Sequence, residues 1–496
     1  MAFQEMDIRL GGFNVDYDVL MAIIKGDIKP EDAVLTPESI AAAYARVSRS
    51  NKPLHELRQE AVTDIAATRK SIEKIDHGMG HKSIADHVYF NLDLNFISRL
   101  AVELVERHRL AGYTERSQRF VLFKDDFLIP PEIKSIGLAN EFIKLYKFMF
   151  QTYHEIFTVL RQYVLEKNSI TDPSKLSEAR LTSLENLAKE DARYVIGLAV
   201  QTSFGSSFNG QEIELVIRHL LSDSLQEGQT IGSSFKKLVQ PIAPSLVKYC
   251  EPVEFFKNLP AIIRSIGARY QGRMIGSRSY QRINSFWSSK EPDDVVVAAI
   301  LCEGNVGSLN DCYKLAQTMP VLEKSAIILK VLQERTIHDN VTRHFEMAEF
   351  TFDTIGSASL YAQLKRHRIT TQIPGDYVLD YGITTPQSFI DCNLTDKLVQ
   401  VVEAAEGLYK VILAKTGNQF LATYALTNAH RRRILVKMNL REAYHYAKER
   451  CASFAQWDIQ ETANQMMALV LSKAPISGQL MCGKDCYDSV KAERYQ

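Results

Sequence analysis

The sequence lacks the features that would place the chain in a membrane or on nucleic acid. No stretch approaches the roughly 18 uninterrupted apolar residues that a transmembrane helix needs. Lys and Arg number 59 and Asp and Glu number 59, so the formal net charge is zero, whereas a constitutive nucleic-acid or membrane-surface binder usually carries a basic excess. Residues 1–12 have no signal-peptide architecture. We therefore expect a soluble, cytoplasmic protein that binds neither nucleic acid nor a membrane.

Cysteine is sparse and scattered. The seven cysteines are an odd number at wide spacing, which favours reduced thiols in a cytosol over a disulfide framework. Cys482 and Cys486 form an isolated Cys-x3-Cys, and two unrelated thiols are favoured there because a zinc site needs two more ligands at metal spacing. With 496 residues, 46% hydrophobic and 24% charged, the chain has room for two or more domains with ample cores.

One short run is dense in anion-binding donors. An Arg-His-Arg triplet at 107–109 is followed, after seven residues, by Ser-Gln-Arg at 117–119. Guanidinium groups bind phosphate bidentately, and a serine hydroxyl or a backbone N–H completes such a cradle. Because the surrounding chain is neither basic nor of low complexity, general attraction to nucleic acid is a poor explanation. A second Arg-His-Arg triplet occupies 366–368.

The two triplets belong to an internal repeat. Histidines lie six residues apart upstream of each triplet, His81 and His87 in the first copy and His338 and His344 in the second. Apolar/polar alternation then predicts strands at 88–92 and 348–352. Helix-like stretches at 96–106 and 358–365 deliver each triplet to a helix C-terminus. Cations there complement the helix dipole, which explains one arginine but not the same triplet twice.

The repeats set the expected domain layout. Repeat 1 is placed at 1–245, a linker at 246–290 and repeat 2 at 291–496. The sequence around 240–244, Gln-Pro-Ile-Ala-Pro, breaks the pattern between them. Repeat 1 also carries an extra segment at 134–190, rich in Leu, Lys and Glu at helical spacing, whose counterpart in repeat 2 is shorter.

The pattern resembles the flavin-dependent thymidylate synthases. Their signature, Arg-His-Arg, seven residues, Ser-x-Arg, is matched here without a gap. Other family landmarks stand in the right order: Ala-Arg-Val-Ser at 45–48, Gly-His-Lys-Ser-Ile-Ala-Asp-His at 80–87 and Phe-Leu-Ile-Pro at 127–130. The resemblance covers most of the chain in two copies. It implies an α+β fold of two tandem domains, each a central, mainly antiparallel sheet with packed helices.

Repeat 1 keeps only part of the family's downstream pattern. It has Arg193 in the place of a family arginine and Asn209 sixteen residues later. Gln211 and Leu220, however, stand where two later family arginines belong, and Glu227 replaces the family's tryptophan. Repeat 1 has therefore lost the second half of the pattern.

Repeat 2 has lost the first half instead. Asp376 and Val378 stand where the Ser-x-Arg pair belongs, and no arginine matches Arg193. Its second half fits the family spacing without a gap: Asn439, Arg441, Arg450 and Ala-Gln-Trp-Asp-Ile at 455–459. Repeat 2 also keeps Gln363, a nucleotide-contacting glutamine in the family, where repeat 1 has Leu104.

Family members are homotetramers whose active sites are built by several subunits, and such sites permit complementary loss. Each repeat can drop the half that the other supplies. The resemblance thus implies a homodimer that forms a pseudo-tetramer with two intact and two degenerate sites. The alternative is that repeat 1 is a decayed scaffold and the protein is inactive.

The resemblance also implies the chemistry. The family transfers a methylene from 5,10-methylenetetrahydrofolate to C5 of dUMP and reduces it with a hydride from FAD, which NADPH reduces. The expected substrate-binding residues are Glu115, Ser117, Gln118, Arg119, Arg193, Gln363, Arg366 and Arg450. Ser117 and Arg450 are the expected catalytic residues. Arg450 would act as a fixed cation near the uracil carbonyls, where it stabilises negative charge that develops on the ring.

The expected flavin-binding residues come from both repeats. They are His81, Ser83, Arg107, His108, Arg109, Arg366, His367, Arg368, Asn439 and Arg441. No Gly-x-Gly-x-x-Gly follows a predicted strand, so a Rossmann-type flavin site is not indicated. Phe454 departs from the family, which usually has a histidine before Ala-Gln-Trp. No cysteine and no metal are required by the family's chemistry.

Several other interpretations remain open at this stage. A metal site at His77, His81, Asp86 and His87 is disfavoured because no carboxylate stands at zincin spacing. His-Arg-Arg-Arg at 430–433 fits a solvated helix face better than a nucleic-acid patch. The same chemistry on UMP or another pyrimidine nucleotide, or a non-catalytic regulator that binds flavin or nucleotide, would also fit the motifs.

Overall fold

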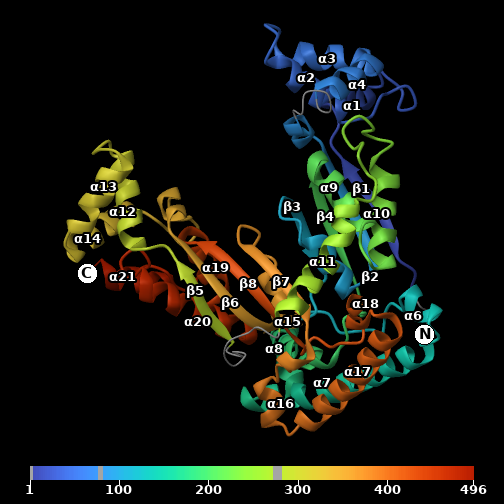
Figure 1. Ribbon diagram of the computed structural model, residues 1–496, viewed down its shortest axis with the longest axis vertical. Helices are drawn as coiled ribbons and strands as arrows, with labels where there is room; N and C mark the ends of the chain where they lie inside the picture. Colours follow the sequence, from blue (N-terminus) through green and yellow to red (C-terminus); the bar gives the residue numbers. More distant parts are fainter. Residues whose placement is uncertain (1–3, 76–81, 272–281, 496) are drawn as a thin grey trace. The chain divides into compact units, whose positions relative to one another are not determined.

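The computed structural model describes residues 4–75, 82–271 and 282–495. The chain divides into two compact units (Figure 1). Unit 1 comprises Met1–Gly276 with Val399–Leu426, and unit 2 comprises Ser277–Leu398 with Thr427–Gln496. Among the described residues, each unit has one four-stranded sheet with a hydrophobic cluster that includes its buried face, and each unit is described by itself.

The sheet of unit 1 has four antiparallel strands in the order β1-β2-β4-β3. Their bounds are β1 Asp7–Phe13, β2 Tyr89–Ser98, β3 Ala111–Glu115 and β4 Gln201–Asn209. Side chains alternate along β2, so that Phe90 and Leu92 are buried while Tyr89 and Asn91 are exposed. The buried face packs against α9 (Gly210–Leu221) and α10 (Gln226–Val239), which contribute much of the core.

The described part of unit 1 contains nine further helices from the first part of the chain. Their bounds are α1 Tyr17–Lys25, α2 Glu38–Val47, α3 Leu54–Thr63, α4 Ile65–Glu73, α5 Arg99–Glu106, α6 Pro131–Ser135, α7 Ala139–Lys167, α8 Glu178–Ala192 and α11 Glu254–Gln271. Short 3₁₀ helices are η2 Lys82–His87, η3 Pro173–Lys175 and η4 Arg193–Val195. The segment 134–190, expected to be helical, therefore forms α7 and most of α8.

Unit 2 repeats the same plan, with a four-stranded antiparallel sheet in the order β5-β6-β8-β7. The strands are β5 Ile283–Ser288, β6 Glu349–Ser357, β7 Thr371–Tyr377 and β8 Arg431–Asn439. The helices are α12 Pro292–Glu303, α13 Leu309–Thr318, α14 Val321–Leu332, α15 Ala358–Leu364, α16 Gln387–Asp391, α19 Leu440–Arg450, α20 Trp457–Lys473 and α21 Tyr487–Arg494, with 3₁₀ turns η5 Arg343–Met347 and η6 Leu379–Tyr381. The α+β class expected from the sequence is confirmed.

The predicted strand–helix succession before each triplet is confirmed, with one shift. The helix expected at 96–106 begins only at Arg99, because β2 continues to Ser98. Phe96 lies at a φ of 58°, where the strand is irregular. The hydroxyl of Ser98 accepts a hydrogen bond from Ala101 N at 2.9 Å and so caps the helix. Ser357 caps α15 in the same way.

The units do not follow the expected domain boundaries everywhere. Within 246–290, the range expected as a linker, lie α11 and β5, and β5 pairs with β6 as the edge strand of the second sheet. Most of α17 (Thr395–Thr416) and α18 (Gln419–Thr423) belong to unit 1, although their sequence lies in repeat 2. Helix α17 runs beside α7 (Figure 1), and Lys415 Nζ donates to Ile136 O at 3.3 Å.

A buried carboxylate joins this segment to unit 1. Glu227, 3% exposed, accepts hydrogen bonds from the backbone N–H and hydroxyl of Ser98 and from the hydroxyl of Tyr424. The hydroxyl of Tyr146 in turn donates to the carbonyl of Tyr424 at 2.6 Å. Burial disfavours the charged form of a carboxylate, and it raises the pKa of Glu227. The three hydrogen-bond donors offset part of the free-energy cost of burying this side chain.

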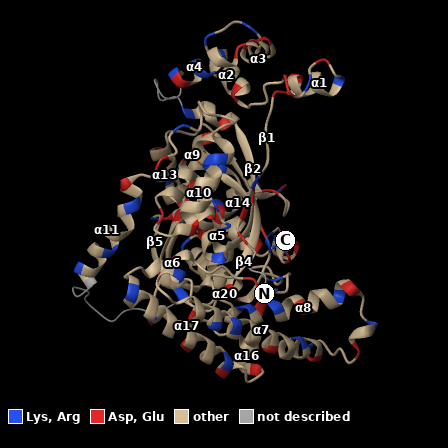
Figure 2. Cartoon of the chain, turned by 90° about the vertical axis from the view of Figure 1, so that its right-hand side faces the viewer, with Lys and Arg blue, Asp and Glu red and all other residues tan. Residues whose placement is uncertain are grey.

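Charge is distributed as the neutral composition suggests. Figure 2 shows basic and acidic residues interspersed along the helices that face the viewer. Among the described residues, no helix is both long enough and apolar enough to cross a membrane.

Candidate active site

The predicted substrate-binding residues of repeat 1 gather in a cluster of arginines and glutamates. Arg119 Nε lies 2.5 Å from a carboxylate oxygen of Glu190, and Arg193 Nε donates to the carbonyl of Glu190 at 3.1 Å. Arg99 pairs with Glu115 at 3.3 Å. Arg193 is only 3% exposed, and burial, with Arg119 and Arg99 nearby, lowers its pKa. The three guanidinium groups exceed the two carboxylates by one charge, so the cluster favours an anion.

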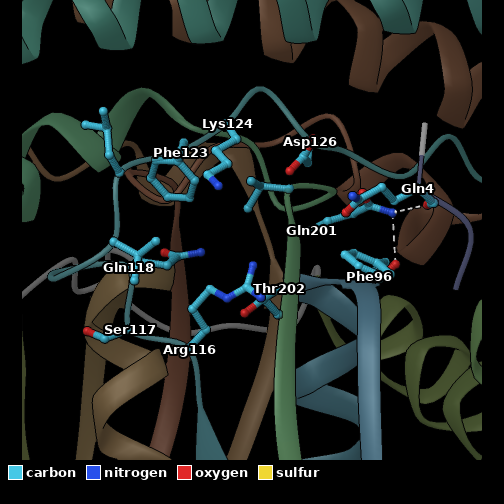
Figure 3. A pocket seen from close by; sticks show the side chains of 13 residues that line it. Gln4, Phe96, Arg116, Ser117, Gln118, Phe123, Lys124, Asp126, Gln201 and Thr202 are labelled. Atoms are coloured by element: carbon cyan, nitrogen blue, oxygen red, sulfur yellow. Dashed lines mark hydrogen bonds between the residues drawn. The ribbon is translucent and has the colours of Figure 1, made fainter. Parts of the chain in front are cut away.

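A cavity of about 300 Å³ opens beside this cluster (Figure 3). Ser117 and Gln118 line it, and the hydroxyl of Ser117 accepts a hydrogen bond from Arg119 N at 3.1 Å. On the opposite side, Gln201 donates from Nε2 to Gln4 O at 2.8 Å and to Phe96 O at 2.9 Å, as the dashed lines in Figure 3 mark. The signature loop therefore forms one wall of a polar hollow.

Six polar residues that line this cavity were not predicted from the sequence: Gln4, Arg116, Lys124, Asp126, Gln201 and Thr202. Two of them are cations and one is a carboxylate. Arg116 stands at the unspecified position just before the signature serine, and nothing in the spacing marks Lys124 or Gln201. Only the folding of the loop after β3 onto the start of β4 brings them together.

Both Arg-His-Arg triplets adopt the same arrangement. Each follows the last turn of a helix, with the two arginines exposed and the histidine buried; His108 is 5% and His367 3% exposed. His108 Nδ1 lies 3.0 Å from Val105 O, and its Nε2 lies 2.7 Å from His219 Nδ1. Burial lowers the pKa of His108 to about 3 and that of His219 to about 4, so this pair is neutral at physiological pH.

The second triplet has different partners. His367 Nδ1 lies 3.2 Å from Glu442 Oε1, and Arg450 Nε donates to His367 Nε2 at 2.9 Å. Burial lowers the pKa of His367 well below its usual value, and burial raises the pKa of Glu442 to about 7. The predicted base-side cation Arg450 is thus anchored on the buried histidine of the triplet.

Gln363, predicted to contact the nucleotide, lies in the same unit. Its side chain is 7% exposed and donates from Nε2 to Gln456 Oε1 at 3.0 Å. Arg441 pairs with Glu346 at 2.6 Å, and the side chain of Asn439 accepts from Glu442 N at 2.8 Å as the N-cap of α19. Asn439 and Arg441, predicted to bind flavin, therefore also hold local structure.

The two upstream landmarks of repeat 1 meet at a second cavity of about 650 Å³. Arg46 and Ser48 of the Ala-Arg-Val-Ser run line it, as does the exposed Ser83 of η2. His81, predicted with Ser83 to bind flavin, lies outside the described residues. His77 of the metal hypothesis also lies outside them, while the carboxylate of Asp86 accepts from Asn209 Nδ2 at 3.0 Å.

Among the described residues, one other group has metal-like spacing. Single ligand atoms of His367, Glu442 and His445 lie within 4.8 Å of one another. Both ring nitrogens of His367 are already engaged by Glu442 and Arg450, so the group is better explained as a hydrogen-bond chain.

The structure corrects two details of the sequence analysis. Residues 430–433 do not form a solvated helix face: Arg432 lies on β8, 8% exposed, between the rings of Tyr361 and Tyr377 at 4.9 and 4.4 Å. Glu227 does not occupy the place of Trp457. It is the second residue of α10 and accepts from Ser98, as Asp458, the second residue of α20, accepts from Ser357 at 2.6 Å.

Two cysteines near the C-terminus are held as thiols by burial. No disulfide joins the seven cysteines, all of which lie in the described residues. Burial raises the pKa of Cys451 to about 12 and that of Cys482 to about 11. A thiol is nucleophilic only as thiolate, so these groups are poor nucleophiles at neutral pH. Phe454, at the position where the family has a histidine, lies under Lys484 Nζ at 4.6 Å.

The buried histidine pair predicts acid sensitivity. The folded pKa of His108, about 3, lies below the unfolded value near 6.5, so its contribution to stability is present above about pH 6.5 and is lost as pH falls. Between pH 6.5 and 4.5 the free energy of unfolding should fall about 2 kcal/mol more in the wild type than in His108→Asn. Urea unfolding at several pH values measures this difference.

An exposed histidine supplies the control for that experiment. His55→Asn, at an exposed position, should keep the pH dependence of the wild type. Equal pH dependence in the wild type and His108→Asn would show that His108 takes up its proton as readily in the folded protein as in the unfolded chain.

Comparison with known proteins agrees with the repeat architecture. The family model described as thymidylate synthase complementing protein matches residues 32–245 and again 287–476. The UPF0159 protein Ta1429 of Thermoplasma acidophilum is 21% identical over 470 residues, which cover 88% of this chain and 93% of that protein. The flavin-dependent thymidylate synthase of Clostridium tetani is 29% identical over 240 residues, which cover 47% of this chain and 89% of that protein.

A solved structure also matches part of the chain. It is described as a UMP/dUMP methylase PolB from Streptomyces cacaoi bound with 5-Br dUMP, and it aligns with a TM-score of 0.32 and 17% identity over 39% of this chain and 92% of that one. The family model spans both repeats and most of the chain. The chain therefore belongs to the thymidylate synthase complementing protein family, as a two-repeat protein resembling flavin-dependent thymidylate synthases.

Proposed function

We propose that the protein is an FAD-dependent thymidylate synthase that converts dUMP to dTMP, with 5,10-methylenetetrahydrofolate as carbon donor and NADPH as reductant. The observation that carries the proposal is the division of the family's residues between the units. Unit 1 has the Ser117–Arg119–Arg193 cluster, and unit 2 has Arg450 anchored on the second triplet. We propose that one active site draws on both sets and that the protein works as a homodimer.

The cluster in unit 1 suits the nucleotide phosphate. Glu190 holds Arg119 and Arg193 together through its carboxylate and its carbonyl. A dianionic phosphate would meet two guanidinium groups there, with the hydroxyl of Ser117 as a further donor. Arg366, exposed at the start of the second triplet, and the buried amide of Gln363 would complete the binding of the nucleotide.

Arg450 would act on the base. Its Nε is bound to His367, and a bond there fixes the plane in which the two terminal amino groups lie. A cation held in that way stabilises negative charge that develops on the uracil carbonyls as C5 becomes nucleophilic and the ring is later reduced. His367 is neutral, so it holds Arg450 without competing for the same anion.

The donor set fits a dinucleotide flavin. Each triplet exposes two arginines around a buried histidine, namely Arg107 and Arg109 in unit 1 and Arg366 and Arg368 in unit 2. Two exposed guanidinium groups on one turn match the two negative charges of a pyrophosphate. When bound, the flavin supplies the hydride, and the chain supplies position and charge.

Three linked measurements test the proposal. The purified protein should be yellow or become so on incubation with FAD. NADPH should bleach it, and 5,10-methylenetetrahydrofolate with dUMP should then give dTMP, identified by mass spectrometry. UMP is offered in a parallel reaction. Methylation of UMP alone would change the acceptor, whereas flavin binding without methylation of either nucleotide would make the protein a regulator. A protein that binds no flavin would contradict the proposal.

A further inference from the structure

His367 lies between a carboxylate and a guanidinium inside unit 2. Its Nδ1 is 3.2 Å from Glu442 Oε1, and its Nε2 is 2.9 Å from Arg450 Nε. The histidine is 3% exposed and the glutamate 5%. Water therefore competes little for either hydrogen bond, and the three side chains form one chain of contacts.

Donor chemistry fixes the state of the ring. A guanidinium has N–H donors and no acceptor, so His367 Nε2 must present its lone pair to Arg450. The imidazole is then neutral with its proton on Nδ1, and that proton points at Glu442. If the proton moved to Nε2, two donors would face each other and Arg450 would lose its anchor.

We propose that Glu442 is a positioning residue for the reaction: it holds His367 in the Nδ1-protonated tautomer, whose Nε2 orients the Arg450 guanidinium. The inference rests on the proposed function, because Arg450 is taken there as the base-side cation. Glu442 touches neither substrate nor flavin in this account. It acts through His367, although its carboxylate also lies near His445 and Arg441.

Repeat 1 contains a natural comparison. Glu212 is the third residue of α9, as Glu442 is the third residue of α19, and both donate their backbone N–H to a capping asparagine. His108 Nδ1, however, donates to the carbonyl of Val105. Leu220 stands where Arg450 would be, and His219 occupies the Nε2 side. Glu212 therefore has the same place in the fold, but it lies beside Arg109 and Leu110, and no arginine stands on the Nε2 side of His108 for it to orient.

Three variants separate positioning from packing. Glu442→Leu removes the acceptor, and kcat/KM for dUMP should fall about tenfold to a hundredfold, mainly through kcat, as expected when a reacting group is misplaced. Glu442→Gln keeps a carbonyl oxygen that can accept from Nδ1, so it should retain at least about half of the activity. Glu212→Leu, at a position 7% exposed beside Arg109, is the matched control; with FAD at saturation its kcat should stay close to that of the wild type.

The ring state is read directly, without turnover. In protein labelled with ¹⁵N-histidine, the His367 signals, assigned by their loss in His367→Asn, should report protonated Nδ1 and unprotonated Nε2. In Glu442→Leu they should move toward the Nε2-protonated tautomer, while Glu442→Gln should resemble the wild type.

Several results would overturn the proposal. These are an Nε2-protonated ring in the wild type, a folded Glu442→Leu protein with kcat/KM within twofold of the wild type, or equal losses in Glu442→Leu and Glu442→Gln. Failure of the wild type to make dTMP would instead count against the proposed function. The positioning of Arg450 through His367 would then be decided by the ring signals alone.

Discussion

Replacing Arg450 with alanine should abolish dTMP formation, with kcat lowered by about a hundredfold to a thousandfold. This size is typical when a preorganised donor to a developing charge is removed. Arg450 ends α19 and is anchored through Nε on the buried His367, so its position is set before substrate arrives. Rapid-quench measurement of dTMP formed from the reduced enzyme isolates this step from flavin reduction. Flavin absorbance should persist, because the cofactor residues are untouched.

The matched control for Arg450 lies in repeat 1. Leu220 occupies the corresponding position on α9, but it is fully buried in the core of unit 1. A truncation there would leave a cavity and confuse stability with activity, so the control is the volume-conserving Leu220→Met. Turnover should stay close to that of the wild type. If Leu220→Met abolished turnover in a folded protein, the two repeats would not divide the work as proposed.

Replacing Arg119 with alanine should lower dUMP affinity by at least roughly tenfold. Loss of a charged contact to a phosphate costs about 2–5 kcal/mol, and every 1.4 kcal/mol is about a factor of ten. The structure adds that Arg119 is paired with Glu190 beside the buried Arg193. Without Arg119 the carboxylate of Glu190 loses its partner and repels the phosphate, which enlarges the effect. Titration of dUMP against the flavin spectrum gives the dissociation constant directly.

Two further measurements accompany the Arg119→Ala variant. Val378, half-buried in repeat 2 at the position that matches Arg119, should tolerate alanine with little change in affinity. Mixed dimers of Arg119→Ala and Arg450→Ala chains report where the two halves come from. Recovery of one active site means that the halves come from two chains, and no recovery means that they come from one. Loss of activity in Val378→Ala would contradict the assignment of that position as degenerate.

The local placement of the two triplets could be predicted because it depends on residues close in sequence. The helix-like stretches before them predicted a helix C-terminus, and the structure places both triplets just beyond α5 and α15. The start of α5 was placed three residues too early, because the apolar pattern around Phe96 fits a helix as well as an irregular strand. Likewise, His-Arg-Arg-Arg at 430–433 looked like a solvated surface, yet it is the start of the buried strand β8.

The amino-acid sequence by itself determined the duplication, the α+β class and the complementary losses, at Gln211 and Leu220 in repeat 1 and at Asp376 and Val378 in repeat 2, since spacing and residue type carry that information. Only the tertiary structure decided which charged groups pair and which nitrogen of a histidine carries the proton. Glu190 joins Arg119 to Arg193, Glu442 reaches His367 across 75 residues, and Val399–Leu426 packs with unit 1 through Tyr424. The physical reason is that a tautomer, a lowered pKa or a buried ion pair depends on burial and on partners far away in the chain. The local pattern of apolar and polar residues shows neither the burial of a side chain nor its distant partners.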